Sequence, residues 1–167
     1  MNWGELLSEA YREALKSRDA STRIGALLVN EGGTVVARGH NSPTPGIAHD
    51  DPRLLLRPEK YLLTEHAERN AVYDAAARGV GVRGLTMVTP WNPCADCARG
   101  AIMSGVSRMV CHAEALHIPG WDSSRDIGLE MLEAAGVEII MASCAPEVEG
   151  IFAGGVWHYP MTTIPSR

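Results

Sequence analysis

The chain has 167 residues, of which 46% are hydrophobic and 21% charged, as in ordinary globular proteins. Its formal net charge is −5 and aromatic residues make up only 5% of it, which argues against a basic, stacking surface for nucleic acid. We find no apolar stretch long enough to span a bilayer and no secretion signal, so we expect a cytoplasmic protein. The length predicts one domain, with a core over about residues 1–141 and a tail over 142–167.

Helices and strands alternate along most of the chain. The pattern predicts a helix over 3–18 and two strands over 24–29 and 34–37, which a glycine-containing hairpin joins. A long loop then runs from about 40 to 61, and loops of that length are usually functional or disordered. The remaining pattern predicts helices over about 65–78, 95–104 and 123–135, strands over 85–88, 107–111 and 137–141, and a possible short helix near 147–152. This alternation predicts a layered α/β fold with a mixed sheet.

Two short motifs supply metal-binding side chains. His66 is followed two residues later by Glu68, and Cys94 and Cys97 form a Pro-Cys-x-x-Cys sequence. One imidazole and two thiolates suit zinc, and three protein ligands leave a fourth position for water, as in catalytic sites. The pair of motifs is the signature of zinc deaminases that act on nucleobases. We therefore expect one catalytic Zn²⁺ per chain, held by His66, Cys94 and Cys97.

The spacing also predicts where these residues lie. Glu68 is the expected proton carrier from water to the substrate, which requires a carboxylate close to the metal but not bound to it. His66 and Glu68 are two residues apart and do not share a helix face, so we expect them at a helix N-terminus. Cys94 and Cys97 are expected one turn apart at the start of another helix, where the helix dipole favours thiolates.

A structural zinc site is the alternative reading of these motifs. It would need a fourth protein ligand, and Cys111 or His112 follow the Cys97 helix closely enough to supply one. Glu68 has no purpose in such a site. Cys111 lies in an apolar run and is more simply interpreted as a small buried side chain. The four cysteines show no disulfide framework.

The chain resembles the cytidine and deoxycytidylate deaminase superfamily, and within it the dCMP deaminase branch. The resemblance covers most of the chain and depends on residues 21–26, 39–41, 66–71 and 93–98, in that order. It implies a three-layer α/β/α fold with a five-stranded mixed sheet, zinc on His66, Cys94 and Cys97, and Glu68 as the proton shuttle. It also implies a nucleotide contact from Asn41 and a homo-oligomer. Ala67, between the two motif residues, is a further candidate substrate contact.

The resemblance makes hydrolytic deamination of dCMP to dUMP and ammonia the leading hypothesis. A phosphate needs cationic donors, and we favour Arg57 and Lys60 in the long loop and Arg69 beside Glu68. Other candidates for this contact are Arg23, Arg53 and Arg78. The family often has Gly-Tyr-Asn-Gly where this chain has Gly-His-Asn-Ser over 39–42, which weakens the transfer of that loop's contacts.

Three other functions stay open from the sequence. A nucleoside, a free base, a modified deoxycytidylate or a pyrimidine intermediate of riboflavin synthesis could be the substrate instead. Adenosine in tRNA is the nucleic-acid alternative, although we expect no nucleic-acid partner and no membrane partner. A non-catalytic module that zinc stabilises belongs to a different class, and it predicts that Glu68→Gln changes nothing.

Overall fold

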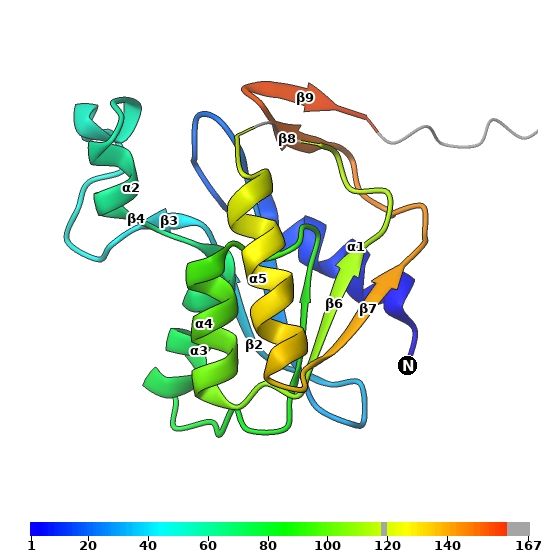
Figure 1. Ribbon diagram of the computed structural model, residues 1–167. Coiled ribbons are helices and arrows are strands. Elements are labelled where there is room, and N and C mark those ends of the chain that lie inside the picture. The colour runs from blue at the N-terminus through cyan, green and yellow to red at the C-terminus, as the bar shows by residue number, and fades with distance from the viewer. Residues whose placement is uncertain (118–119, 160–167) are drawn as a thin grey trace, which may run out of the picture.

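A computed structural model describes residues 1–117 and 120–159 and contains a five-stranded mixed sheet (Figure 1). Its strands are β1 (Gly25–Val29), β2 (Val35–His40), β5 (Thr86–Thr89), β6 (Arg108–His112) and β7 (Glu138–Ala142), in the order β2-β1-β5-β6-β7. Strand β1 pairs antiparallel with β2 and β5, and β5, β6 and β7 run parallel. The predicted mixed sheet is confirmed. Within the described residues, no helix has the length and apolarity to cross a membrane.

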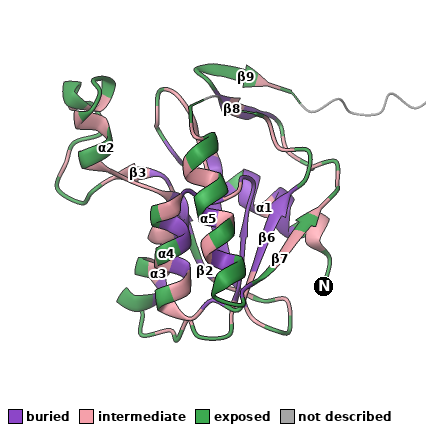
Figure 2. Ribbon diagram, viewed as in Figure 1, coloured by how far each residue is buried: buried purple, intermediate pink, exposed green. Residues whose placement is uncertain are grey.

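Helices cover both faces of the sheet, which confirms the three-layer prediction. The first helix, α1 (Trp3–Ala14), packs on one face, where Leu27 and Val29 are fully buried. The opposite face carries α3 (Ala67–Ala77), α4 (Ala95–Ser104) and α5 (Asp122–Ala134) (Figure 1). Ala26 and Leu28 point to that side because side chains alternate along a strand. Buried residues therefore concentrate in the central strands and on the inward helix faces (Figure 2).

Two glycines allow the helices to approach very closely. A Cβ atom on Gly39 of β2 would lie 2.3 Å from the Ala67 carbonyl oxygen and 2.3 Å from the Ala71 nitrogen. A Cβ atom on Gly128 of α5 would lie 2.4 Å from the Pro93 carbonyl oxygen. Only a residue without a side chain fits at these contacts, so the first turn of α3 and the approach to α4 are held at fixed distances from their neighbours.

The predicted long loop contains regular structure, so this part of the prediction was wrong. It holds β3 (Ser42–Pro43), a 3₁₀ turn η1 (Pro52–Leu55) and α2 (Glu59–Leu63), and β3 pairs with β4 (Thr64–Glu65). Asp51 caps η1 by accepting a hydrogen bond from the Arg53 backbone N–H at 2.9 Å. The segment carrying α2 stands away from the sheet (Figure 1). The helix predicted over 3–18 is also shorter, since Leu15 already caps α1.

The possible short helix near 147–152 is wrong as well. Ile151–Ala153 (β8) and Val156–His158 (β9) form a hairpin instead. Its turn consists of Gly154 and Gly155, both at positive φ (61° and 80°), which is the backbone geometry of tight hairpin turns. The hairpin packs on the segment before β1, because the Arg23 backbone N–H donates to the Phe152 carbonyl at 2.9 Å. The Arg23 guanidinium lies 5.4 Å from the Trp157 ring.

Candidate active site

The residues of the two motifs lie at the starts of α3 and α4. His66 is the N-cap of α3 and Glu68 is in its first turn, whereas Cys94 is the N-cap of α4 and Cys97 is in its first turn. The predicted location at two helix N-termini is confirmed. The His66 Nδ1 atom lies 3.5 Å from the sulfur of Cys94 and 3.5 Å from that of Cys97. All three ligand atoms lie within 4.8 Å of one another.

This cluster fits a metal ion in its chemistry and its surroundings. One imidazole and two sulfur atoms form the ligand set that zinc prefers, and both cysteines are buried. In the part of the chain that the structure describes, no other group of three such side chains converges in this way. The zinc prediction is therefore consistent with the arrangement of the donors.

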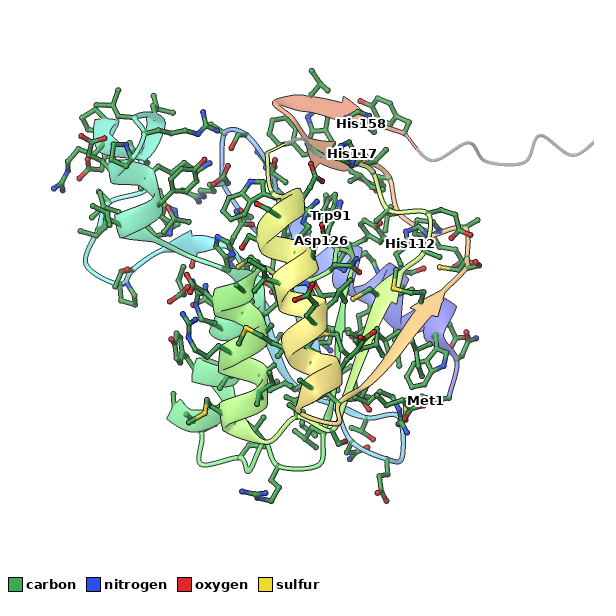
Figure 3. All side chains as sticks on the ribbon, in the orientation of Figure 1. Met1, Trp91, His112, His117, Asp126 and His158 are labelled. Atoms are coloured by element: carbon green, nitrogen blue, oxygen red, sulfur yellow. The ribbon has the colours of Figure 1, made fainter. Side chains whose placement is uncertain are left out.

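The two candidates for a fourth ligand are engaged elsewhere. His112 at the end of β6 (Figure 3) places its Nδ1 atom 2.8 Å from the Tyr11 hydroxyl and its Nε2 atom 2.9 Å from the Cys144 carbonyl oxygen. Cys111 is fully buried, as predicted, and its sulfur faces the Trp91 carbonyl oxygen at 3.6 Å. Among the described residues the cluster therefore offers three candidate ligands and not four, which favours a catalytic site over a closed structural one.

The surroundings of the two cysteines favour the thiolate form of Cys94, whereas the hydrogen bond with Cys94 and burial raise the pKa of Cys97. Hydrogen bonds from Cys97 and from His66 lower the pKa of Cys94 to about 3. Arg69 donates to the Cys97 sulfur at 3.4 Å, and its guanidinium also bonds to Glu65, with Nε 2.6 Å from the carboxylate. Arg69 therefore lies beside the candidate metal ligands and does not line the cavity in front of them.

Glu68 has the environment expected of a proton carrier. Its side chain is only 4% exposed, and burial raises the pKa of its carboxyl group. The Oε2 atom is buried and has no hydrogen-bond partner among the described residues. A buried acceptor without a partner is costly and rare, so it indicates a position where another group is to bind.

A cavity of about 770 Å³ opens in front of this cluster, a size suited to a small ligand such as a nucleotide. Its walls come from several places in the chain: the segment before β1, Asn41 after β2, the α2 region, the two motifs, the start of α5 and the turn of the β8–β9 hairpin. The lining includes Asp19, Ser21, Thr22, Asn41, Arg57, Lys60, Tyr61, His66, Glu68, Asn92, Cys94, Trp121, Ser124, Arg125, Gly154 and Gly155.

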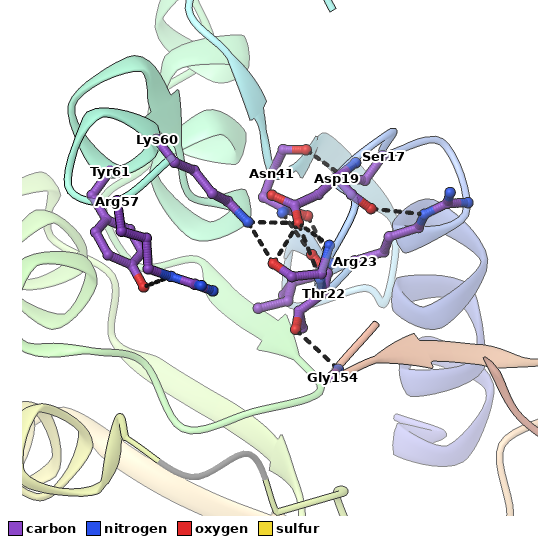
Figure 4. Close-up of polar contacts among 11 residues, drawn as sticks. Ser17, Asp19, Thr22, Arg23, Asn41, Arg57, Lys60, Tyr61 and Gly154 are labelled. Carbon is purple, nitrogen blue, oxygen red and sulfur yellow. Dashed lines mark hydrogen bonds and ion pairs between the residues drawn. The ribbon is translucent and has the colours of Figure 1, made fainter. Parts of the chain in front are cut away.

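Lys60 closes one side of the cavity by pairing with Asp19 (Figure 4). Its Nζ atom lies 2.7 Å from Asp19 Oδ1 and 2.5 Å from the Ser21 hydroxyl. Burial alone would raise the pKa of Asp19, but hydrogen bonds from Lys60 and from the Thr22 and Ser21 backbone lower it below its usual value. The Lys60 cation is therefore already neutralised by a carboxylate.

The other predicted substrate contacts differ in what they offer. Asn41 accepts from the Ile24 backbone N–H at 2.8 Å and donates to the Thr22 carbonyl at 2.9 Å, which leaves one amide N–H for a ligand. Arg57 donates to the Tyr61 hydroxyl at 2.7 Å (Figure 4). The Ala67 side chain is fully buried in the core and does not reach the cavity.

Among the cavity residues that were not assigned from the sequence, three have notable surroundings. The Trp121 ring lies edge-on to His66, with ring centroids 5.5 Å apart, and 5.8 Å from Tyr61. Arg125 lies one turn further along α5, and the Oδ1 atom of Asn92 is buried without a partner among the described residues. The sequence signal for Trp121 and Arg125 as cavity residues is weak. It consists only of an aromatic residue and an arginine four residues apart near a predicted helix start.

Comparison with known proteins agrees with this arrangement. Residues 2–113 match the family model of the cytidine and deoxycytidylate deaminase zinc-binding region. The deoxycytidylate deaminase of Enterobacteria phage T4 is 26% identical, covering 83% of this chain and 89% of the phage protein. An uncharacterized deaminase from the luxG 3′ region of Aliivibrio fischeri is 30% identical, covering 74% of this chain and 81% of its own length.

The fold is also similar to a solved structure. The dCMP deaminase of cyanophage S-TIM5, in a crystal structure with dCMP and dUMP, superimposes with a TM-score of 0.64 at 22% identity. The match covers 81% of this chain and 91% of that protein, so the cytidine-deaminase-like fold is confirmed. From the family model and the relatives together, the chain belongs to the cytidine and deoxycytidylate deaminase family.

Proposed function

We propose that this protein is a zinc-dependent hydrolase that converts dCMP and water to dUMP and ammonia. The observation that supports it most is the buried Glu68 carboxylate, with one oxygen lacking a partner, beside a three-ligand metal cluster at the inner end of a nucleotide-sized cavity. The names of the T4 and cyanophage relatives support dCMP as the substrate.

His66, Cys94 and Cys97 would hold the zinc ion, which when bound lowers the pKa of water toward about 7. Glu68 would accept the proton that the attacking water loses and donate a proton to the ring nitrogen of the base. It would then take the remaining proton of the added hydroxyl group and transfer it to the amino group, so that the C–N bond breaks, ammonia leaves and the carbonyl forms. Because Glu68 is buried and carries an oxygen without a partner, it can exchange protons with a substrate without competition from bulk water.

The base would lie beside Trp121, whose edge contacts the His66 ring and thereby forms a wall next to the metal ligands. Asn41, directly after β2, would donate its remaining amide N–H to the nucleotide. Ala67 could contribute only its backbone N–H in the first turn of α3, because its side chain is buried. Arg57 lines the cavity and would add positive charge at its outer edge.

We also propose that copies of the chain associate, as the family resemblance suggests. Leu55 and Leu56 at the end of η1 and Leu62 of α2 are 71%, 55% and 80% exposed, which supports a contact with another copy. Sedimentation equilibrium would test this: a homo-oligomer is expected, and a monomer at all concentrations would contradict it.

A substrate panel tests the proposed reaction. Zinc-loaded protein would be incubated with dCMP, CMP, deoxycytidine, cytosine, dCTP and 5-methyl-dCMP, and the products separated by chromatography. Preferential conversion of dCMP supports the proposal, and preference for another member would move the activity to that substrate. No conversion of any member, with zinc bound, would contradict a pyrimidine deaminase and make purine or tRNA substrates the next to test.

A further inference from the structure

The wall of the cavity carries three cationic side chains in the part of the chain that the structure describes: Arg57, Lys60 and Arg125. Lys60 is only 13% exposed and forms an ion pair with Asp19. Arg57 donates to the neutral Tyr61 hydroxyl. Arg125 is half-buried, yet within residues 1–117 and 120–159 its guanidinium has no ion-pair or hydrogen-bond partner. It is therefore the inward cation best able to accept an anion.

The backbone under Arg125 is held firmly against the metal-ligand motif. One residue earlier, the Ser124 hydroxyl accepts a hydrogen bond from the Ala95 backbone N–H at 3.2 Å. One turn later, Gly128 packs so closely on Pro93 that a Cβ atom would lie 2.4 Å from its carbonyl oxygen. Both contacts join this turn of α5 to the start of α4, so the base of the Arg125 side chain keeps its position relative to Cys94.

The nearest acidic neighbour on α5 does not neutralise Arg125. Asp122 precedes it by three residues, but its carboxylate is 55% exposed and lies 3.7 Å from His117. A half-buried guanidinium that forms no ion pair among the described residues is unfavourable. Burial lowers the pKa of Arg125, and the negative charges of Asp122, Glu68 and Cys94 offset this only in part. An incoming anion would remove this cost and gain charge-assisted hydrogen bonds in a partly dehydrated place.

We infer that Arg125 binds the phosphate of the nucleotide substrate and thereby makes the enzyme prefer a nucleotide over a nucleoside. This inference rests on the proposed function and assigns phosphate binding to one residue. Trp121, one helical turn earlier, lies against His66, so a base beside Trp121 and a phosphate at Arg125 would follow the same face of α5. The planar guanidinium can donate two parallel hydrogen bonds to phosphate oxygens.

Steady-state kinetics on dCMP and deoxycytidine tests the assignment, because the two substrates differ only in the phosphate. For Arg125→Gln we expect kcat/KM on dCMP to fall by about 10- to 100-fold, the usual effect of losing a charged hydrogen bond, with little change on deoxycytidine. Arg125→Lys keeps the charge, so its kcat/KM on dCMP should lie between those of the wild-type protein and Arg125→Gln. The matched control is Arg99→Gln, since Arg99 is an exposed arginine of α4 that pairs with Asp96 outside the cavity.

A binding measurement separates this inference from the proposed reaction. Calorimetric titration of dCMP and deoxycytidine into Glu68→Gln protein, with and without Arg125→Gln, needs no turnover. Tighter binding of dCMP than deoxycytidine that Arg125→Gln abolishes supports the inference, even if the wild-type protein deaminates neither compound. Equal losses on both substrates would show a positioning role for Arg125, and no loss on dCMP would exclude the contact; either result overturns the inference.

Discussion

The inner end of the cavity and its outer rim are built in different ways. At the inner end, His66, Glu68, Cys94 and Cys97 come from two short motifs at the starts of adjacent helices on the buried sheet. The rim is assembled from distant segments, so that Lys60 reaches Asp19 41 residues away and the Gly155 backbone donates to Ser21 at 2.7 Å. The reactive groups are therefore set by local geometry, and the shape of the opening by long-range contacts.

This difference suggests a division of roles. The residues of the inner end carry out the hydrolysis of the ring amine, and this reaction requires their side chains to keep fixed positions. The rim and the face of α5 determine which molecule reaches that end. Changes at the inner end should therefore abolish the metal site or the reaction, whereas changes at the rim should alter substrate preference or stability by smaller amounts.

The largest effect is expected from loss of a metal ligand. Cys97→Ser should reduce bound zinc from one per chain to a small fraction and abolish deamination, because a hydroxyl is a much poorer zinc ligand than a thiolate. Cys111→Ala is the matched control, since Cys111 is another fully buried cysteine that faces a backbone carbonyl. Elemental analysis by mass spectrometry would check both variants. Equal zinc in the two would contradict the assignment of Cys97.

The next largest effect concerns the glycine that seats α3 on the sheet. Gly39→Ala should destabilise the protein by about 3 kcal/mol, the upper end for overpacking, because the new Cβ atom would meet backbone atoms that cannot move aside. Gly81→Ala provides the control, since no heavy atom lies within 4 Å of that position. Urea unfolding would measure both. A Gly39→Ala protein as stable as wild type would show that the start of α3 is less tightly fixed than described.

The smallest effect is expected at the rim. Asp19→Asn keeps the acceptor oxygen for the Ser21 and Thr22 N–H groups but removes the charge that pairs with Lys60, which should cost about 1–2 kcal/mol at pH 7. The folded-state pKa of Asp19 is lowered, so its contribution is present above the unfolded value of about 3.9 and is lost as pH falls through the folded value. The stabilities of the two proteins should therefore begin to converge below about pH 4 and become equal only once the pH is below the folded pKa of Asp19. A stability difference that stays constant as the pH falls well below about 4 would rule out the ion pair as its cause.

Much of the inner end could be predicted from the sequence because its information is local. The spacing of a histidine and a glutamate two residues apart, and of two cysteines three apart, already indicates side chains at helix starts, where the structure has them. The pairing of Lys60 with Asp19 and the approach of Trp121 to His66 depend on how separate segments pack. Hydrophobic periodicity carries no such information, so α2 was missed within a predicted loop.

The helix predicted near 147–152 was wrong for a related reason. Residues 147–152 contain helix-forming side chains, but the two glycines that follow favour a tight turn, and pairing of Ile151 with His158 then determines the local structure. Arg125 was overlooked because a lone arginine on a predicted helix is usually a surface charge. Only the structure shows that Arg125 lines the cavity and forms no ion pair with another described residue.

The most direct test is to compare wild-type protein with Glu68→Gln for zinc content and for conversion of dCMP to dUMP. We predict one zinc per chain in both proteins and a loss of turnover of about 10³-fold in the variant, within the range known for removal of a general acid–base group. Unchanged turnover with zinc retained would contradict the proton-transfer role of Glu68 and with it the proposed mechanism.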